Sequence, residues 1–473
     1  MRALFNSQQL WYLLFLFCVL TRIITSIHYI EDIDSLRFAY SIVDEYNILK
    51  LQPHFPGYAV FCFIANILYA IVGNMGLTFS IIGGISTFVI IYYSLKLLEI
   101  RLNSKIGLFT TLFIFFNPMF WLMSNRYMPD FMGLSVLIAS FYFLCQKNNK
   151  EILIGCFGIG LLAGIRISYM PILLIPIIIV FINSNNKLLV FSTISFGIII
   201  WFLPMILMTG LENLYNMALK HTSGHFTEYG GTIITETNWI IRLQYFFHTL
   251  WSDGLGGYWI NRSPITALLS ILLFPLIILF IKNIKSIIID NSNIRILFLS
   301  IIVYIIWILL FQNIIYKSRH IMPLVLLLLI LFSIIFKNHF LIYNNIKYIY
   351  MLSIIIITSY ISINLSLQHK EPTAIKKVSQ FLSEKEKPML IISIPLINYY
   401  LKSQNINAQY IAIENNIKKV SLDSLADNKA VFVIGNFSEK IIGLSAELDT
   451  TFYHNPYVNR MWSDINVYSN EGL

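Results

Sequence analysis

Charged residues are scarce in this sequence, and this scarcity excludes an ordinary soluble protein. Aspartate, glutamate, lysine and arginine make up 12% of the 473 residues, whereas soluble globular proteins carry about 25%. Hydrophobic residues make up 57%, and the mean hydropathy is +0.71. We therefore expect an α-helical polytopic membrane protein. The net charge of +9 does not indicate a nucleic-acid partner, because lysines in short loops between apolar runs set membrane topology.

Cysteine is also scarce, which excludes a disulfide framework and any metal site with cysteine-ligand spacing. The four cysteines all fall in apolar runs: Cys18, Cys62, Cys145 and Cys156. A dinucleotide-binding loop is missing too, because the most closely spaced glycines follow no strand and lack the required spacing. We attribute those glycines to close helix packing; they are Gly155, Gly158, Gly160 and Gly164.

Apolar runs fill most of residues 1–367 and predict about eleven spanning helices, since one span needs roughly 20 apolar residues. The predicted spans are Leu10–Ile27, Leu77–Leu98, Ile106–Leu122, Phe131–Cys145, Ile152–Ile165, Pro171–Ile182, Leu188–Met208, Pro264–Ile281, Ile296–Phe311, Met322–Phe336 and Ile349–Ile363. Residues 1–367 are thus expected to form a transmembrane domain.

Two further segments, the amphipathic Ser35–Leu49 and the apolar Gly57–Val72, are expected to lie in the membrane interface. Charge decides this placement, because counting Gly57–Val72 as a span would reverse every later loop. With it in the interface, the basic residues fall on the cytoplasmic side, as the positive-inside rule requires. These residues are Lys96, Arg101, Lys105, Lys147, Lys150, Lys187, Lys282, Lys285, Arg295, Lys337 and Lys347.

The polar tail, residues 368–473, then lies outside as a small α/β domain. Thr373–Ser383 is expected to be a helix. The β-branched and aromatic runs of the tail predict strands at Met389–Ser393, Tyr410–Ile413, Ala430–Ile434 and Thr450–Tyr453. Helices between strands favour a layered α/β arrangement.

The first external loop carries three acids, Glu31, Asp32 and Asp34. Carboxylates at such a boundary can deprotonate or orient a hydroxyl group. The alternative is an interfacial loop that stays in contact with water.

Each of the later external turns contains an arginine. Arg126 and Asp130 share one turn, where Asp130 could serve only to cap a helix. Arg166 lies alone between apolar runs, so it either extends to the interface or meets an anionic partner such as a lipid phosphate. Arg319 and His320 form another cationic group, suited to phosphate oxygens.

A long external loop is expected over Thr209–Ser263. It contains His221, His225 and Glu228, whose spacing matches no metal-ligand motif. We expect no metal or other cofactor from it, although a divalent metal stays possible. A glycine-rich flap over a site is the favoured interpretation.

These segments resemble the membrane glycosyltransferases of the GT-C superfamily, in particular aminoarabinose transferases and protein O-mannosyltransferases. Asp34-Ser-Leu-Arg-Phe-Ala39 resembles the first-loop Asp-x-x-Arg-aromatic-Ala, whose Asp is the presumed base, but Ser35 replaces the usual Glu. Asp32 is therefore a rival for that role. Three more elements match: Pro53-His-Phe-Pro-Gly-Tyr58, which brings His54 and Tyr58; Asp130 after the third span; and Arg319-His-Ile-Met-Pro323.

The resemblance implies transfer of a sugar from a polyprenyl-phosphate donor to a hydroxyl-bearing lipid, glycan or protein. Residues 1–367 would be the catalytic domain, in a bacterial inner membrane with the active site facing the periplasm. Asp34 would accept the acceptor proton. Arg166, Arg319, Arg126 and His320 would hold the leaving phosphate, and direct displacement would invert the anomeric centre.

Other functions stay open at this stage. A polysaccharide polymerase or ligase with a lipid-diphosphate substrate would also have many spans and external arginines. A transporter would place its ionisable groups near the bilayer midplane in related halves, and no inverted repeat is evident here. A non-catalytic relative of the superfamily is a further alternative, because Ser35 and His54 depart from its pattern.

Overall fold

The structure is a computed structural model that describes residues 7–228, 231–313, 317–339, 344–385, 388–413, 420–421, 429–436, 441–442 and 447–469. The chain divides into two compact units. The helical unit comprises Met1–Ile27 and Tyr40–Leu367, and the sheet unit comprises His28–Ala39 and Gln368–Leu473. Helix α2 (Ile33–Val43) begins in the sheet unit and ends in the helical unit.

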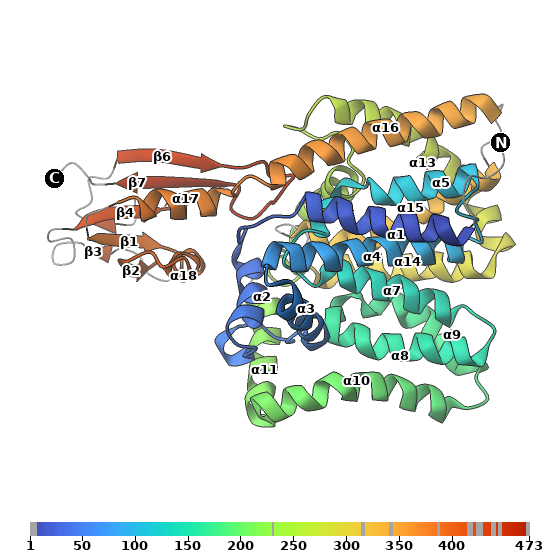
Figure 1. Cartoon of the computed structure of the whole chain (residues 1–473), viewed down its shortest axis with the longest axis horizontal. Helices are drawn as coiled ribbons and strands as arrows, with labels where there is room; N and C mark the ends of the chain where they lie inside the picture. Colours follow the sequence, from blue (N-terminus) through green and yellow to red (C-terminus); the bar gives the residue numbers. More distant parts are fainter. Residues whose placement is uncertain are drawn as a thin grey trace. The chain divides into compact units, whose positions relative to one another are not determined.

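The longest helices of the helical unit are apolar and run alongside one another (Figure 1). The described helices of this unit are α1 (Ser7–Ile24), α3 (Ala59–Val72), α4 (Met75–Leu97), α5 (Lys105–Phe115), α6 (Pro118–Met123), α7 (Asp130–Leu144), α8 (Asn149–Arg166), α9 (Leu174–Asn183), α10 (Lys187–Thr209), α11 (Leu211–Thr227), α12 (Trp239–His248), α13 (Ile265–Asp290), α14 (Ser292–Phe311), α15 (Met322–Ile334) and α16 (Asn344–His369). Shorter helical turns join them at η1 (Ile48–Lys50), η2 (Ile167–Leu173), η3 (Thr249–Gly254), η4 (Ser318–Ile321) and η5 (Ile335–His339).

Seven helical stretches among the described residues are long and apolar enough to cross a membrane, and α1, α3, α5 and α7 are shorter apolar helices. Each of the predicted spans overlaps a helix of the structure. The prediction of an α-helical multi-pass membrane protein is therefore confirmed.

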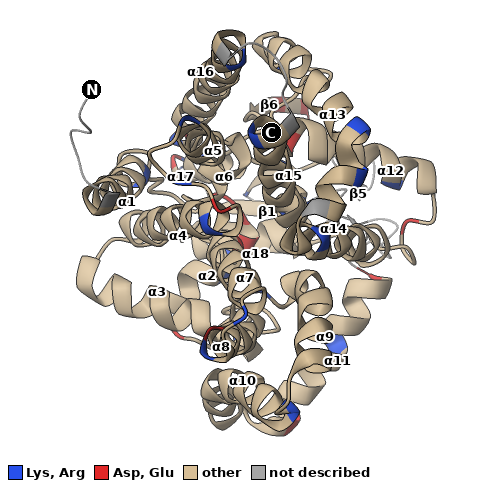
Figure 2. Ribbon diagram, turned by 90° about the vertical axis from the view of Figure 1, so that its right-hand side faces the viewer, with Lys and Arg blue, Asp and Glu red and all other residues tan. Residues whose placement is uncertain are grey.

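Helix α3 differs from the others in its direction. In both Figure 1 and Figure 2 it lies across the long helices rather than along them, at one end of the bundle. Gly73, with φ +68°, ends it. The sequence placed this apolar segment in the interface, and a crosswise helix has the orientation that an interface segment needs.

Short polar side chains set where many of the helices begin. Asn and Ser side chains accept backbone N–H groups of the first turn, as is usual at helix N-termini. The capping residues are Asn74 for α4, Ser104 for α5, Asn117 for α6, Asn148 for α8, Asn186 for α10, Asn238 for α12 and Asn291 for α14.

Glycines allow α8 to approach its neighbours closely. A Cβ atom at Gly160 would lie 2.6 Å from Gly197 Cα on α10, and one at Gly155 would lie 2.9 Å from Leu144 N on α7. Small residues permit such backbone contact. The attribution of these glycines to helix packing is confirmed.

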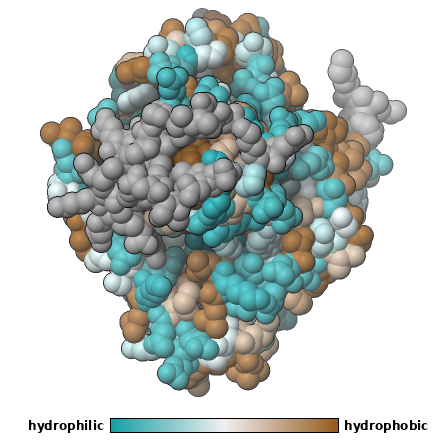
Figure 3. Space-filling view, turned by 90° about the vertical axis from the view of Figure 1, so that its left-hand side faces the viewer, coloured by the Kyte–Doolittle hydropathy of each residue, from teal (hydrophilic) through white to brown (hydrophobic). Residues whose placement is uncertain are grey.

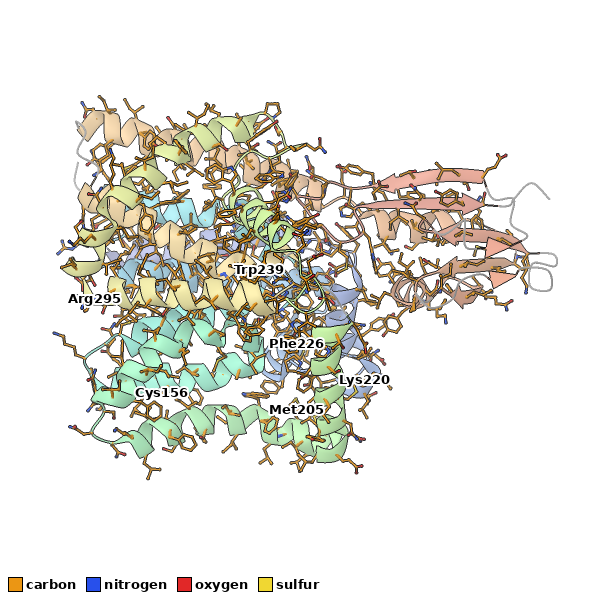
Figure 4. The ribbon with its side chains drawn as sticks, turned by 180° about the vertical axis from the view of Figure 1, so that it is seen from behind. Cys156, Met205, Lys220, Phe226, Trp239 and Arg295 are labelled. Atoms are coloured by element: carbon orange, nitrogen blue, oxygen red, sulfur yellow. The ribbon has the colours of Figure 1, made fainter. Side chains whose placement is uncertain are left out.

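The two ends of the bundle differ in charge. The turns after α4, α7 and α9 lie at the end that faces the viewer in Figure 2, where lysine and arginine lie at several helix ends. Arg295, near the start of α14, lies at this end in Figure 4, opposite Lys220 and Phe226 of α11. We call it the basic end and the other the polar end.

The predicted long loop Thr209–Ser263 is wrong as a loop, because α11, α12 and η3 occupy most of it. Leu214 on α11 packs with Ile48 and Met205 in a buried cluster, so tertiary contacts stabilise this helix. Its polar composition of Lys, His, Asn and Thr hid the helical spacing of its apolar residues.

Within its described residues, the sheet unit contains a five-stranded sheet with strand order β2-β1-β4-β7-β6 and a two-stranded sheet of β3 and β5. Strands β2, β1 and β4 are parallel, whereas β7 is antiparallel to both β4 and β6. The strands are β1 (Met389–Ser393), β2 (Ala408–Ala412), β3 (Val420–Ser421), β4 (Ala430–Ile434), β5 (Ile441–Ile442), β6 (Glu447–Tyr453) and β7 (Asp464–Ser469).

The parallel strands form the core of this sheet. Every residue of β1 and β4 is buried, as expected for strands covered on both faces. Helices α17 (Ala374–Ser383) and α18 (Pro395–Ser403) pack against the sheet. On the face seen in Figure 3, hydrophilic and hydrophobic residues of the described parts of the chain lie side by side. The predicted helix and strands overlap α17, β1, β2, β4 and β6, while β3, β5 and β7 were missed.

Candidate functional site

Asp130 is the centre of a buried polar cluster at the polar end of the helical unit. It is the first residue of α7 and only 1% exposed. Its Oδ1 lies 2.9 Å from Arg166 Nη2 and 3.6 Å from Arg319 Nε. The carboxylate therefore does more than cap a helix, because it forms ion pairs with two arginines from distant turns.

Arg166, the last residue of α8, spreads its guanidinium over several partners. Besides the pair with Asp130, Nη1 donates to the hydroxyl of Tyr58 at 3.1 Å, and Nη2 lies 3.4 Å from His320 Nδ1. The side chain is buried, and its Cζ lies 5.8 Å from the ring centre of Tyr58 and 5.9 Å from that of Tyr169. Of the two alternatives for this arginine, the structure shows the one with an anionic partner.

The backbone conformation just before α3 places the Tyr58 side chain next to Arg166. Gly57 has φ +90°, and a Cβ there would lie 2.7 Å from the Tyr46 hydroxyl, so the position requires glycine. Tyr58 itself has φ 47°, which is uncommon for a tyrosine and frequent at functional sites. Its hydroxyl also lies 3.2 Å from His54 Nε2.

Arg319 and His320 enter from η4, just before α15. Both are buried, and the hydroxyl of Tyr304 on α14 donates to the backbone oxygen of His320 at 2.8 Å. This bond holds the turn from which Arg319 reaches Asp130 and His320 reaches Arg166. We call Asp130, Arg166, Arg319, His320 and Tyr58 the arginine cluster.

Arg126 is buried in the turn before α7, with Nη1 3.8 Å from Met123 Sδ. The same turn is tied to the end of α1, because Asn125 Nδ2 donates to Thr25 O and the Tyr127 hydroxyl to Ile27 O. Two hydrogen bonds therefore anchor the turn that presents Asp130 to the segment after α1.

The first-loop acids are buried in the sheet unit. Asp32 caps α2, because its Oδ1 accepts the Ser35 N–H at 2.8 Å and its backbone oxygen accepts the Leu36 N–H at 3.0 Å. Asp34 lies in the first turn of α2, where its Oδ1 is 3.9 Å from Arg37 Nη1. The arginine cluster belongs to the helical unit, so the sharing of one site by the acids and the arginines stays a prediction.

Several polar residues escaped the sequence analysis. Glu31 pairs with His369, and Asn459 donates to both Glu31 and Asp32; no local pattern links these positions. Arg22 is buried in α1, bonds to the Ser124 hydroxyl at 2.9 Å and lies over the ring of Trp121. A lone arginine inside the first apolar run was the signal that could have revealed it.

The histidines of the predicted loop have structural partners. His225 Nε2 lies 2.8 Å from Phe311 O, and the ring of His221 stacks on that of His54. In the part of the chain that the structure describes, no group of three or more His, Cys, Asp or Glu residues could hold a metal ion. Metal independence stays a prediction.

Comparison with solved structures identifies the fold. The apo form of ArnT from Cupriavidus metallidurans matches with a TM-score of 0.52 and 10% identity over 98% of each chain. The same protein bound to undecaprenyl phosphate matches with a TM-score of 0.50 and 10% identity, also over 98% of each chain. This chain has the GT-C fold. No protein-family model and no curated protein sequence matches the chain.

The GT-C fold accounts for the order of the elements described above. The crosswise α3, the helical bundle and the C-terminal sheet all fall within the stretch that aligns with ArnT, because the alignment covers 98% of this chain. At 10% identity, the likeness extends to the fold and leaves the roles of individual side chains to be argued from their own contacts.

Proposed function

We propose that this GT-C protein is a glycosyltransferase that moves a sugar from a polyprenyl-phosphate donor to a hydroxyl-bearing acceptor. The arginine cluster is the observation that carries the proposal. It gathers two guanidinium groups, an imidazole and a phenol around one carboxylate. The likeness to a structure of ArnT bound to undecaprenyl phosphate supports the donor class.

The charge of the cluster suits a phosphate. Arg166 and Arg319 bring two positive charges to the single negative charge of Asp130, so the cluster favours a further anion. Guanidinium groups bind phosphate oxygens through paired N–H donors. Asp130 would hold the guanidinium groups of Arg166 and Arg319 in place before the donor binds. Less reorganisation is then needed when charge develops on the leaving phosphate.

The acceptor hydroxyl needs a base, and we assign this role to Asp34, which stands first in the Asp-x-x-Arg-aromatic-Ala element of the first loop. The rival Asp32 caps α2 through the Ser35 N–H, so its carboxylate has a structural role. In the proposed step the acceptor oxygen bonds to the anomeric carbon while its proton passes to Asp34. The bond from that carbon to the phosphate oxygen breaks, and its electron pair leaves with the phosphate. Attack from the opposite face inverts the anomeric centre.

We place the polar end of the bundle on the outer face of a bacterial inner membrane. The support is the concentration of Lys and Arg at the basic end (Figure 2), which marks a cytoplasmic face. In a protein freed of its native cysteines, a membrane-impermeant maleimide should label a Lys220→Cys variant in intact cells. A Lys150→Cys variant should react only after permeabilisation, and the reverse pattern would overturn this placement.

The activity is tested with the full-length protein in lipid nanodiscs. A radiolabelled polyprenyl-monophosphate sugar is supplied with acceptors extracted from the native membrane, and transfer of label is measured. Asp34→Asn should abolish transfer while Asp44→Asn, an identical change at an exposed position just after α2, leaves it intact. Full activity in Asp34→Asn would refute its role as base.

The same purified protein separates the alternatives. Transfer from a diphosphate-linked donor alone would favour a polymerase or ligase. Movement of substrate across the membrane of liposomes that contain the protein, with no covalent product, would favour a transporter. Retention at the anomeric centre would contradict direct displacement.

A further inference from the structure

Asn459 bridges two acids of the first loop from a distant part of the sheet unit. Its Nδ2 donates to Glu31 Oε2 at 3.3 Å and to Asp32 Oδ2 at 3.1 Å. Glu31, Asp32 and Asn459 are all nearly inaccessible, with exposures of 0%, 1% and 3%. Two buried carboxylates side by side repel each other unless donors stand between them, and Asn459 supplies that donor.

The orientation of the Asn459 amide is fixed by its own surroundings. Its Oδ1 accepts the Met461 N–H at 2.9 Å, and its backbone oxygen lies 2.8 Å from His454 Nε2. His454 in turn accepts the Ala374 N–H through Nδ1 at 3.0 Å. Because Oδ1 is occupied by a donor, the amide presents only its N–H groups to the acids.

Glu31 is held from a second direction by the end of α16 and the segment after it. Its Oε2 lies 2.9 Å from His369 Nε2, and its backbone oxygen accepts the Thr373 hydroxyl at 2.9 Å. Its Oε1 accepts the Ser35 hydroxyl at 3.3 Å. The loop backbone is anchored as well, since Tyr29 donates to His369 O and Tyr400 to Ile30 O.

The start of α2 therefore depends on the C-terminal part of the chain. Asp32 caps this helix and is bonded to Asn459, and Asp34 follows within the same first turn. A shift of Asp32 would rotate the first turn and carry the Asp34 carboxylate with it. Buried hydrogen bonds of this kind fix side-chain geometry.

We propose that Asn459 and His369 are positioning residues for transfer: through Glu31 and Asp32 they set the position of the Asp34 carboxylate. The C-terminal sheet unit is then part of the catalytic apparatus rather than an accessory. This inference rests on the proposed glycosyl transfer, in which Asp34 is the base.

The test replaces the bridging donor by an acceptor. Asn459→Asp retains Oδ1 for the Met461 N–H but sets a third carboxylate against Glu31 and Asp32. Asn455→Asp is the matched control, because Asn455 Oδ1 likewise accepts an N–H two residues on, from Tyr457, while its Nδ2 donates to the exposed Gln368. Both variants are assayed as full-length protein in nanodiscs.

We expect kcat of Asn459→Asp to fall by roughly 10- to 100-fold at pH 7, the range for loss of a buried hydrogen bond to a charged group. KM for the donor should stay unchanged, because the phosphate is bound elsewhere. The deficit should shrink as pH falls, since the introduced carboxyl group, once protonated, can again donate to Glu31 or Asp32. Two histidines are also close to this network: His369 contacts Glu31, and His454 contacts the backbone oxygen of residue 459. Asn455→Asp should match the wild type at every pH.

His369 is tested by a conservative pair. His369→Gln retains a donor toward Glu31 and should keep most of kcat, whereas His369→Leu should lose it with no change in donor KM. Equal kcat in wild type, Asn459→Asp and His369→Leu would overturn the inference while leaving the proposed function standing. No transfer by the wild type would instead refute the proposed function itself. A parallel fall of kcat and rise of KM at every pH would mark a general loss of structure and also overturn the positioning role.

Discussion

Replacing Arg166 by lysine separates the charge of the arginine cluster from its geometry. The guanidinium contacts Asp130 and His320 through Nη2, at 2.9 and 3.4 Å, and Tyr58 through Nη1, at 3.1 Å. The ammonium group of a lysine retains the positive charge and the ion pair with Asp130. It cannot also reproduce the paired N–H donors of the planar guanidinium group. Insertion and folding should therefore survive in Arg166→Lys, while the paired donors offered to a phosphate are lost.

The magnitude follows from the contacts that disappear. A hydrogen bond to a charged group contributes about 1.5–3 kcal/mol, and each 1.4 kcal/mol is a tenfold change in affinity. The Kd for undecaprenyl phosphate should thus rise by roughly 10- to 100-fold in Arg166→Lys. Arg166→Met, which also removes the charge, should lose measurable binding altogether.

The assay is equilibrium binding of undecaprenyl phosphate to protein in nanodiscs, with thermal unfolding as a check of the fold. Lys220→Met, a change at an exposed basic residue of α11 at the same end of the bundle (Figure 4), serves as the control and should bind like the wild type. An Arg166→Lys protein that binds with wild-type affinity would refute the assignment of this guanidinium to the phosphate.

Further predictions concern packing around the same cluster. In Gly133→Ala the new Cβ would lie 2.7 Å from Arg166 Cβ, so overpacking should lower the free energy of unfolding by about 1–3 kcal/mol. Donor binding should also weaken, although every charge is retained. The control Ser135→Ala, on the same helix, should change neither stability nor donor binding. Arg22→Met leaves Phe115 O and the Ser124 hydroxyl without this donor, so the free energy of unfolding should fall by about 1–3 kcal/mol while kcat per folded molecule is unchanged. Donor binding in Gly133→Ala equal to that of the wild type, or a loss of kcat in Arg22→Met, would contradict these contacts.

Hydrophobic runs and charge were enough to predict the helical unit. A membrane span requires about 20 apolar residues, so each span can be predicted from a short stretch of the sequence. The crosswise α3 could be predicted because basic loops have to fall on one side, although its own composition resembles that of a span. The spans follow from the length of each apolar run, and the placement of α3 follows from the side on which the basic loops fall.

The candidate site was predictable as a set of residues but not as a set of contacts. Arg166, Arg319 and His320 stood out because a charge beside an apolar run is costly. The contact of Arg166 with His320, 154 positions apart, is fixed only by helix packing. Glu31 and His369 are 338 positions apart, so their pairing was beyond any local pattern.

The errors of the sequence analysis share one cause. Helix α11 carries many polar residues, and its apolar Leu214 is stabilised by Ile48 and Met205 from other segments. Strand β7 was missed because its pairing with β4 and β6, rather than a long apolar run, stabilises it. In both places tertiary contacts outweigh local composition.

An experimental structure of the full-length protein with undecaprenyl phosphate in nanodiscs tests the central claim most directly. The account predicts phosphate oxygens about 2.7–2.9 Å from guanidinium nitrogens of Arg166 and Arg319. A lipid phosphate bound at any other place, with Arg166 and Arg319 paired only with Asp130, would contradict it.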